Sequence, residues 1–407
     1  MTSEDAPARK AVPPEDAALP ACPHAASAPL DRDGHVVRVR SVQTARAILQ
    51  ERHRTRQAGF TAEFIPQGVL RHHPILMSDG PLHDEQRRKT ARFFAPAVIA
   101  RRHSDLMAAT ADELLCEASR TGEMQLDDLA LIYSVTVTAE VVGLTESPVA
   151  AMAARLTTFF NQPPLDITRP DLGRTRRQWM LAAVNGLVPV FRFYLRDVRP
   201  AIRSRRRTPC DDVITHLISE GYTDADIAVE CVTFGTAGMV TTREFICMAA
   251  WHLLCDAALR QRYLAADQPG RLAVLNEIMR LEPVVGHLYR RVIEPFTVPT
   301  PDGDAALQAG DLVDIRVRDT NVDPDAVGAD PQRLYPGRPL APGLDASGLS
   351  FSHGAHKCPG QSLALLETDA LLVRLLAMPV ELDTEPDITW DDLIAGYALR
   401  GMRLRVG

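Results

Sequence analysis

The sequence lacks the common signatures of zinc-binding, secreted and membrane-spanning proteins. It contains no CxxC pair and no HExxH motif, so a structural or catalytic zinc site has little support. No run of about 18 apolar residues occurs, and the first residues form no apolar signal segment. We therefore expect no membrane partner and a cytoplasmic location.

Basic residues are fewer than acidic residues. Lys and Arg number 45 against 52 Asp and Glu, which gives a net charge of -7 and argues against nucleic acid as a partner. The one dense basic run, 203–207, lies among Pro, Ser and acidic residues, so we interpret it as a solvated loop. The seven cysteines are an odd number without paired spacing, which is typical of a reducing compartment.

Most of the chain has the apolar spacing of helices, and strand-like runs are few. Helical spacing appears near 104–119, 126–144, 148–160, 176–196, 211–219, 223–255, 271–282 and 360–377. Strands are predicted at 35–39, 290–298 and 311–317, with a possible hairpin in 394–406. This pattern predicts a mainly α fold with a small β-sheet region contributed by both ends of the chain. Residues 1–30, rich in Ala, Pro and charge, are predicted to form a flexible tail.

The longest predicted helix, 223–255, contains a local conflict. Thr223 and Asp226 form a plausible capping box at its start, and a continuous helix would span about 50 Å. Its middle, TFGTAGMVTT at 233–242, holds two glycines and four threonines, which are disfavoured in helix interiors. Such conflicts favour a functional site, and close packing by another helix is the alternative.

A second unusual stretch, FSHGAHKCPG at 351–360, places Cys358 in a short loop. Adjacent Lys and Pro argue against a buried apolar filler, and no second thiol lies nearby to complete a zinc site. No arrangement of Cys and His in the sequence is diagnostic of a catalytic nucleophile. The remaining interpretation is a lone thiolate ligand for a haem iron.

The neighbours of Cys358 agree with that interpretation. The apolar pattern resumes after Gly360, so Cys358 precedes a helix N-terminus, where free N–H groups favour an anion. Gly354 and Gly360 permit a tight turn and a close approach to a flat macrocycle. His356 can reach a carboxylate on the edge of that macrocycle.

The loop resembles the cysteine signature of the cytochrome P450 family, and other motifs occur in the order typical of that family. The framing positions are Phe351, Gly354, His356, Cys358 and Gly360. The remaining motifs are Glu-x-x-Arg at Glu277 and Arg280, HDEQR with His83 and Arg87, RRVIEP with Arg290, and AGMVTT at 237–242. The resemblance covers roughly residues 30–407. It implies a single large P450 haem domain over 31–407, with a long central helix over the haem.

The resemblance also implies a role for each matched residue. Cys358 would ligate the iron of haem b (iron protoporphyrin IX). The haem propionates would be bound by His83, Arg87, Arg290 and His356. Glu277 and Arg280 would stabilise the fold together with an arginine from a later loop, for which we predict Arg333.

In the central helix, Ala237 and Gly238 would leave room for oxygen, and Thr241 would donate a hydrogen bond to it. The sequence departs from the family at Val240, where the usual residue is an acid that relays protons. Glu244 is predicted to replace that acid, with a purely structural contact as the alternative. The substrate's own polar group is another candidate donor.

The implied activity is dioxygen activation to oxidise a small organic substrate, with secondary metabolism as the expected context. The chain has no dinucleotide fingerprint, so we expect no bound flavin and predict electrons from NAD(P)H through a ferredoxin reductase and ferredoxin. Oxidative aromatic coupling without oxygen insertion is an alternative that Val240 suggests. A non-catalytic haem-binding module is a further alternative.

Family analogy also predicts two surfaces. An acidic ferredoxin would dock on a positive face that includes Arg88, Lys89, Arg92 and Lys357, unless these are ordinary solvated charges. An apolar substrate pocket would draw on 60–78, 158–170, 234–242, 284–289 and 395–399. Its candidate contacts are Phe159, Phe234, Val240, Leu288 and Tyr397.

Overall fold

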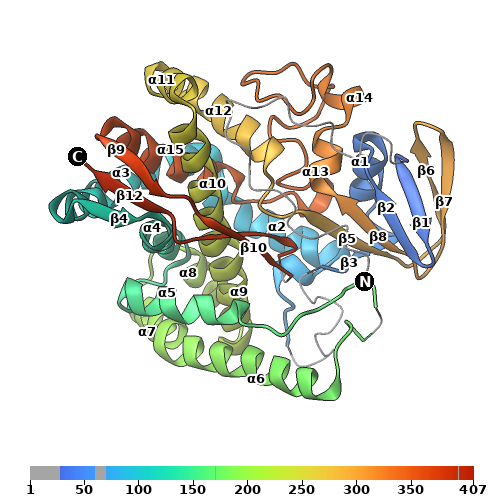
Figure 1. The fold of residues 1–407 in the computed structure, drawn as a ribbon. Helices are drawn as coiled ribbons and strands as arrows, with labels where there is room; N and C mark the ends of the chain where they lie inside the picture. The colour runs from blue at the N-terminus through green and yellow to red at the C-terminus, as the bar shows by residue number, and fades with distance from the viewer. Residues whose placement is uncertain (1–27, 60–69, 170, 393) are drawn as a thin grey trace.

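The computed structural model describes residues 28–59, 70–169, 171–392 and 394–407. Most of the helices lie on one side of the molecule and the largest sheet lies on the other, with a smaller sheet among the helices (Figure 1). The helices are α1 (Val42–Gln50), α2 (Gly80–Phe94), α3 (Pro96–Thr121), α4 (Leu126–Val142), α5 (Val149–Thr157), α6 (Arg176–Phe193), α7 (Arg199–Arg207), α8 (Val213–Ser219), α9 (Asp224–Phe234), α10 (Thr241–Cys255), α11 (Ala257–Ala265), α12 (Gln268–Leu281), α13 (Val317–Asn321), α14 (Pro324–Val327) and α15 (Gln361–Ala377). The mainly α prediction is confirmed. Residues 1–27 lie outside the described residues, so the tail stays a prediction.

The largest sheet joins the two ends of the chain, as predicted. Its order is β1 (Leu30–Asp33), β2 (Val36–Val39), β8 (Leu312–Arg316), β5 (His287–Val292) and β3 (Thr55–Gln57). β2 and β8 pair in parallel with Val37 opposite Val313, and both of these side chains are fully buried. Burying β-branched residues from distant segments in one core holds β1 and β2 to the later part of the chain.

Three smaller sheets complete the β region. They are β4 (Glu123–Gln125) with β12 (Arg403–Val406) and β9 (Val380–Thr384), β10 (Asp387–Asp391) with β11 (Gly396–Arg400), and β6 (Phe296–Thr300) with β7 (Gly303–Leu307). The hairpin predicted within 394–406 is wrong. β11 pairs with β10 and β12 pairs with β9 and β4, because the intervening residues carry the chain from one sheet to another.

Glycine ends two of the long helices. Gly122 after α3 and Gly143 after α4 adopt φ of 76° and 99°, the left-handed conformation of common helix C-caps. A Cβ at Gly143 would also lie 2.5 Å from an Asp212 carboxylate oxygen. Position 143 therefore requires glycine for both its backbone conformation and its contact with the start of α8.

The central helix runs from α9 to α10 through a π-helical segment, η8 (Gly235–Val240). The predicted capping box of Thr223 and Asp226 is present. The segment of predicted conflict is the π segment itself, a feature that often occurs at functional sites. Packing also contributes, because a Cβ at Gly235 would lie 2.8 Å from Leu156 Cδ2.

A buried ion network joins α12 to the loop after α14. Arg280 donates to both carboxylate oxygens of Glu277 at 2.8 and 2.7 Å, and neither residue is more than 3% exposed. The prediction that Arg333 is the third member of this network is wrong, because Arg333 is exposed. Arg338 takes that place, with Nε 3.3 Å from Glu277 Oε1 and with further bonds to the carbonyls of Val327 and Ala329.

The basic run 203–207 is the end of α7 rather than a solvated loop. Arg205 is 8% exposed, and it binds Asp212 and, at 3.3 Å, Glu146. The sequence interpretation failed because it counted charge without the acidic partners that the fold brings to this helix. Separately, no helix among the described residues is long and apolar enough to cross a bilayer.

We expect Arg338→Ala to destabilise the fold by about 3 kcal/mol, because it leaves the buried Glu277 charge only partly compensated. The matched control is Arg333→Ala, which removes an exposed guanidinium five residues earlier and is expected to change stability by less than about 0.5 kcal/mol. Chemical denaturation of both variants measures the difference. Equal losses would contradict the assignment of Arg338 to the network.

Candidate functional site

The loop that carries Cys358 passes so close to α1 that position 354 requires glycine. Gly354 opens a short 3-10 turn, η9 (Gly354–His356), with φ of 67°. A Cβ at this position would lie 2.2 Å from the carbonyl oxygen of Leu49 in α1. This close contact fixes the position of the cysteine loop against α1. The Cys358 N–H donates to the Phe351 carbonyl at 2.8 Å and so closes the loop.

The Cys358 thiol lies against the first turn of α15 while part of the residue remains exposed. Burial raises the pKa of the thiol, whereas the N–H groups of Gly360 and Gln361 and the Arg87 guanidinium act in the opposite direction. N–H donors at a helix N-terminus are the environment in which a thiolate is held as a ligand. The predicted geometry of Cys358 before a helix is therefore present.

Two guanidinium groups, one half-buried and one buried, lie around the cysteine loop with few carboxylates to balance them. Arg87 on α2 donates to the Lys357 carbonyl at 2.5 Å. Arg290 on β5 is 3% exposed and lies 3.5 Å from Asp79 and 3.1 Å from Gln57 Oε1. Burial lowers the pKa of both guanidiniums, which shows that each would gain from a further anionic partner.

The two predicted histidines complete this cluster. The His83 ring stacks on the His356 ring with centroids 4.1 Å apart, and His356 Nε2 lies 3.0 Å from Asp79 Oδ1. Burial and the neighbouring positive groups lower the pKa of His83 to about 4. Arg290 and His356 share the carboxylate of Asp79, and His83 lies 3.7 Å from the carboxylate of the exposed Asp84. The positive groups therefore exceed the carboxylates, so the site fits a ligand that brings two carboxylates, as haem does.

The central helix presents its π segment to an open space. Ala237 is exposed and Gly238 and Thr241 are partly exposed, although the helix around them is mostly buried. Thr241 Oγ1 lies 2.5 Å from the Ala237 carbonyl, which it can use as a hydrogen-bond acceptor. Val240 is 2% exposed and belongs to the buried side of the helix, so it brings no polar group to this space.

Glu244 does not reach that open space. It is 1% exposed, and its carboxylate accepts from Arg243 at 2.6 Å, from the Leu399 N–H at 2.8 Å and from Arg400 at 2.8 Å. These bonds use both oxygens to join α10 to β11. The predicted proton relay through Glu244 is therefore contradicted by its contacts, and the structural alternative is favoured.

A different buried acid lies beside the threonines. Glu367 on α15 is 1% exposed, and burial raises the pKa of its carboxyl well above the ordinary value despite help from Thr242. Thr242 follows Thr241 directly and donates to the Gly238 carbonyl at 2.7 Å. The resemblance to the family's cysteine signature extends to Glu367, but sequence reasoning gave this residue no role, because only the fold brings it to Thr242.

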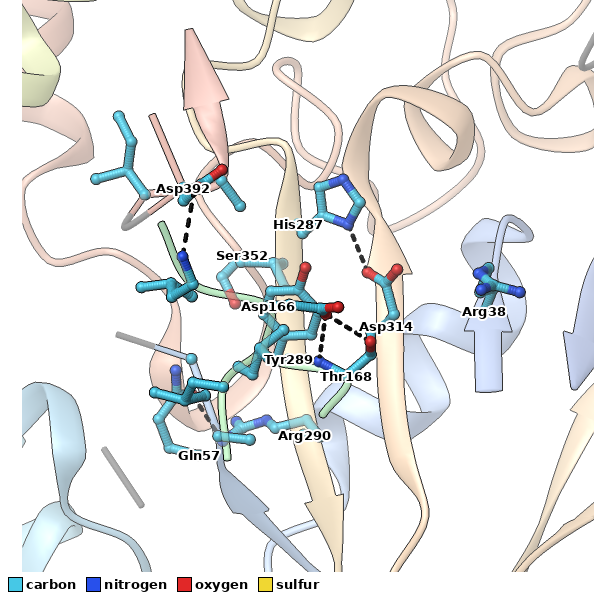
Figure 2. Close-up of a pocket in the computed structure, with 18 of the residues that line it drawn as sticks. Arg38, Gln57, Asp166, Thr168, His287, Tyr289, Arg290, Asp314, Ser352 and Asp392 are labelled. Atoms are coloured by element: carbon cyan, nitrogen blue, oxygen red, sulfur yellow. Dashed lines mark hydrogen bonds and ion pairs between the residues drawn. The ribbon is translucent and has the colours of Figure 1, made fainter. Parts of the chain in front are cut away.

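A cavity of about 290 Å³ lies beside β5 and β8 of the largest sheet, and its lining includes Arg290 and Asp314 (Figure 2). Of the predicted substrate contacts, Leu288 lines it, and Tyr397 lies behind Trp390 with ring centroids 5.9 Å apart. Phe159 packs edge-on against Phe193 in the core, and Phe234 stacks on Phe94. Of the segments predicted to line a pocket, 60–69 lie outside the described residues.

The cavity is more polar than predicted. Figure 2 shows His287 pointing at Asp314 on the neighbouring strand, with Nδ1 2.6 Å from Oδ1. Asp166 accepts from the Thr168 N–H at 3.0 Å, and Asp392 approaches the Leu165 N–H at 3.4 Å. Sequence reasoning missed the acids because three separate segments supply them: 165–168, β8 and the turn after β10.

The charges predicted to dock a ferredoxin are partly neutralised. Lys89 pairs with Glu85 and Glu220, at 2.7 and 2.5 Å, and Lys357 pairs with Asp345 at 2.8 Å. Arg88 is exposed, whereas Arg92 lies over the Phe93 ring at 4.6 Å. A positive docking face here stays a prediction.

Two acids on α9 hold the segment that leads into α2. Asp226 accepts from the N–H groups of Arg71 and His72 at 3.1 and 3.3 Å. One turn later, Glu230 accepts from the Ile75 N–H at 3.0 Å. Burial raises the pKa of Glu230 to about 8. These contacts fix the approach to His83 and Arg87, and sequence reasoning did not find them.

Comparison with known proteins agrees with this geometry. The family model described as Cytochrome P450 matches residues 272–378. Cytochrome P450 BJ-3 of Bradyrhizobium diazoefficiens is 27% identical over 74% of this chain and 70% of its own length. The erythromycin C-12 hydroxylase of Saccharopolyspora erythraea is 27% identical over 78% of this chain and 77% of its own.

A solved structure shares the fold over nearly the whole chain. Ligand-free CYP164A2 of Mycobacterium smegmatis superposes with a TM-score of 0.72, at 26% identity, over 91% of each chain. The similarity therefore extends well beyond the 272–378 match.

We expect Arg87→Ala to release haem about tenfold faster than the unchanged protein, because it removes a half-buried, charged hydrogen-bond donor. Transfer of haem to apomyoglobin measures the rate directly. Arg88→Ala is the matched control, since it removes the neighbouring but exposed guanidinium. Equal rates in the two variants would contradict the assignment of Arg87 to the haem site.

Glu230 predicts a pH effect with a definite sign. The folded pKa of about 8 exceeds the ordinary 4.5, so the folded state binds the proton more tightly and stability falls as pH rises between these values. Glu230→Gln keeps an oxygen for the Ile75 N–H and cannot ionise. We expect it to stabilise the protein at pH 7 by on the order of 1–3 kcal/mol and to flatten the dependence.

The measurement is the free energy of unfolding at pH 5, 7 and 9 for both proteins. Glu230→Ala is the control, since it removes the hydrogen bond as well as the charge. Parallel pH profiles for Glu230→Gln and the unchanged protein would show that Glu230 is not the titrating group.

Proposed function

Because this chain belongs to the cytochrome P450 family, we propose that it binds haem b through Cys358 and oxidises a small organic substrate of secondary metabolism. The observation that carries the proposal is the anion-seeking cluster of Arg87, Arg290, His83 and His356 beside the thiol of Cys358. The similarity to a hydroxylase that acts on erythromycin supports an oxygen-inserting reaction.

Haem bound by a thiolate supplies dioxygen activation, with the sulfur favouring O–O cleavage. The chain's own residues would orient and protect that centre. The N–H groups of Gly360 and Gln361 would stabilise the sulfur as an anionic ligand, and Arg87 and Arg290 would bind the two propionates. The exposed Ala237 and the Thr241 hydroxyl face the space in which oxygen and substrate would meet.

Proton supply must differ from the usual acid–alcohol pair, since Val240 is apolar and Glu244 is fully bonded elsewhere. We propose that Glu367 supplies the protons instead. Burial raises the pKa of its carboxyl, which favours the protonated form, and neither carboxylate oxygen has a hydrogen-bond partner among the described residues. The neighbouring Thr242 bonds to the Gly238 carbonyl of the π segment. A general acid is most effective when it holds its proton at the working pH.

Electrons would come from NAD(P)H through a separate ferredoxin reductase and ferredoxin. Arg88, which is exposed and close to the cysteine-loop side of α2, supports docking of an acidic protein there. Oxidative aromatic coupling stays the second candidate. The observation that favours it is Val240, because an apolar side chain at this position cannot relay the protons that oxygen insertion requires.

Labelling with ¹⁸O₂ distinguishes the two reactions. A substrate would first be found by its shift of the haem Soret band, and its product would then be analysed by mass spectrometry. We expect one ¹⁸O atom in the product. A coupled product without label would replace oxygen insertion by coupling, and no turnover with any Soret-shifting ligand would favour a non-catalytic haem protein.

The two acids give a second test. We expect Glu367→Gln to divert more electrons to peroxide, by roughly tenfold or more, since one proton donor commonly contributes that much. We expect Glu244→Gln to lower thermal stability while leaving the fraction of electrons lost to peroxide unchanged. The reverse pattern would restore Glu244 as the relay.

A further inference from the structure

Exposed apolar side chains are concentrated on a single helix. Nine large hydrophobic side chains are exposed among the described residues, and seven of them lie on α6 and the π-helical turn that follows it, η7 (Tyr194–Val198). The seven, with their exposed fractions, are Met180 66%, Leu181 50%, Val184 56%, Leu187 71%, Val188 40%, Phe191 61% and Leu195 36%. Scattered exposed apolar residues are ordinary, but a contiguous row marks an interaction surface.

The row is uncharged along its length. Residues 178–191 contain no Asp, Glu, Lys or Arg. A solvent-facing helix normally carries its charged residues on the outer face, so α6 has the reverse of the expected pattern. The helix itself is well formed, with a complete capping box at Thr175 and Gln178. The apolar row is therefore a property of a stable helix and not of a poorly packed one.

Positive charge gathers at both ends of the row. Residues 176–207 contain nine arginines and one acid, Asp197, which is buried and bound to Arg155. Within the described part of the chain, no ion pair is formed by the exposed arginines Arg176, Arg177, Arg192, Arg196, Arg199 and Arg203. This concentration occurs in a protein whose net charge is -7. We call residues 176–207 the basic–apolar ridge.

The charge of the ridge selects its partner. Two copies packed ridge to ridge would bring arginines close to arginines, which disfavours self-association. An anionic partner is complementary. The ridge is a single helix at the outer edge of the molecule (Figure 1), and a protruding helix can enter a fluid layer without needing a groove shaped to receive it.

We propose that the basic–apolar ridge docks this protein on an anionic lipid surface. Amphipathic helices that lie in a lipid interface combine an apolar row of this kind with arginines that reach the phosphate groups. The sequence expectation of no membrane partner rested on the absence of a spanning segment, which does not test this mode of binding. The proposal is independent of the reaction assigned above.

Docking of the ridge on lipid would affect which substrates reach the cavity described above. Leu165, Ile167 and Leu172 line it, and the chain continues from them into α6. A docked ridge would bring this wall of the cavity close to the lipid. Apolar substrates concentrated in the lipid would then be favoured over soluble ones.

Co-sedimentation of the haem-loaded protein with vesicles tests the proposal. We expect binding to vesicles of phosphatidylglycerol and phosphatidylcholine at least tenfold stronger than to phosphatidylcholine alone, and weaker binding as salt rises. Leu187→Ser with Phe191→Ser should lower binding about tenfold or more. Arg192→Glu should lower it at least about fivefold, since losing one arginine near such a surface costs roughly that factor and the new carboxylate is repelled as well.

Matched controls separate the ridge from general effects. Leu82→Ser removes an apolar side chain that is 42% exposed on α2, and Arg101→Glu reverses an exposed charge on α3. Both should bind vesicles as the unchanged protein does. The Soret band of the reduced, carbon monoxide-bound protein confirms that each variant keeps its haem site.

Three results would overturn the proposal. The first is no vesicle binding at low salt, and the second is equal loss of binding in the controls and the ridge variants. The third is binding of the ridge to an acidic protein, such as an acyl carrier protein, or to a second copy in sedimentation analysis, with no binding to vesicles. That result would assign the ridge to a protein partner.

Discussion

Surplus positive charge buried beside Cys358 is the constraint around which this structure is built. Arg87 comes from α2, Arg290 from β5 and His356 from the cysteine loop, so three distant segments must meet for the cluster to form. A buried cation without a partner is costly, and Asp79 compensates only part of this cluster. An anionic cofactor bound here would relieve this surplus of positive charge. Cofactor binding and fold stability would then be coupled at this point.

The elements around the cluster serve to hold it in place. The Glu277–Arg280–Arg338 network fixes α12 to the loop after α14, and Gly354 lets the cysteine loop pass close to α1. On the other side, Asp226 and Glu230 hold the segment that leads into α2. On the central helix, Ala237, Gly238 and Thr241 are small and at least partly exposed, although the residues around them are mostly buried.

The ridge on α6 and the site near Cys358 use charge in different ways. Near Cys358, Arg87 is half-buried and Arg290 is buried, and low polarity strengthens their interactions. On the ridge, every arginine except Arg205 is exposed, so salt weakens their interactions with a charged partner. Net charge alone conceals both features, because the 52 acids of the whole chain outnumber its 45 Lys and Arg residues.

The sequence by itself determined the helical architecture, the sheet shared by both chain ends, Cys358 before a helix, and the irregular middle of the central helix. These features follow from local patterns: apolar spacing, caps, and glycines placed where a side chain would clash. Tertiary structure decided the choice of Arg338 over Arg333, the burial of Arg205, and the bonding of Glu244 to β11. It also decided that the apolar side of α6 faces outward. A sequence gives the identity of each charged or apolar group, but its energy depends on which distant groups surround it, and only the folded chain brings those groups together.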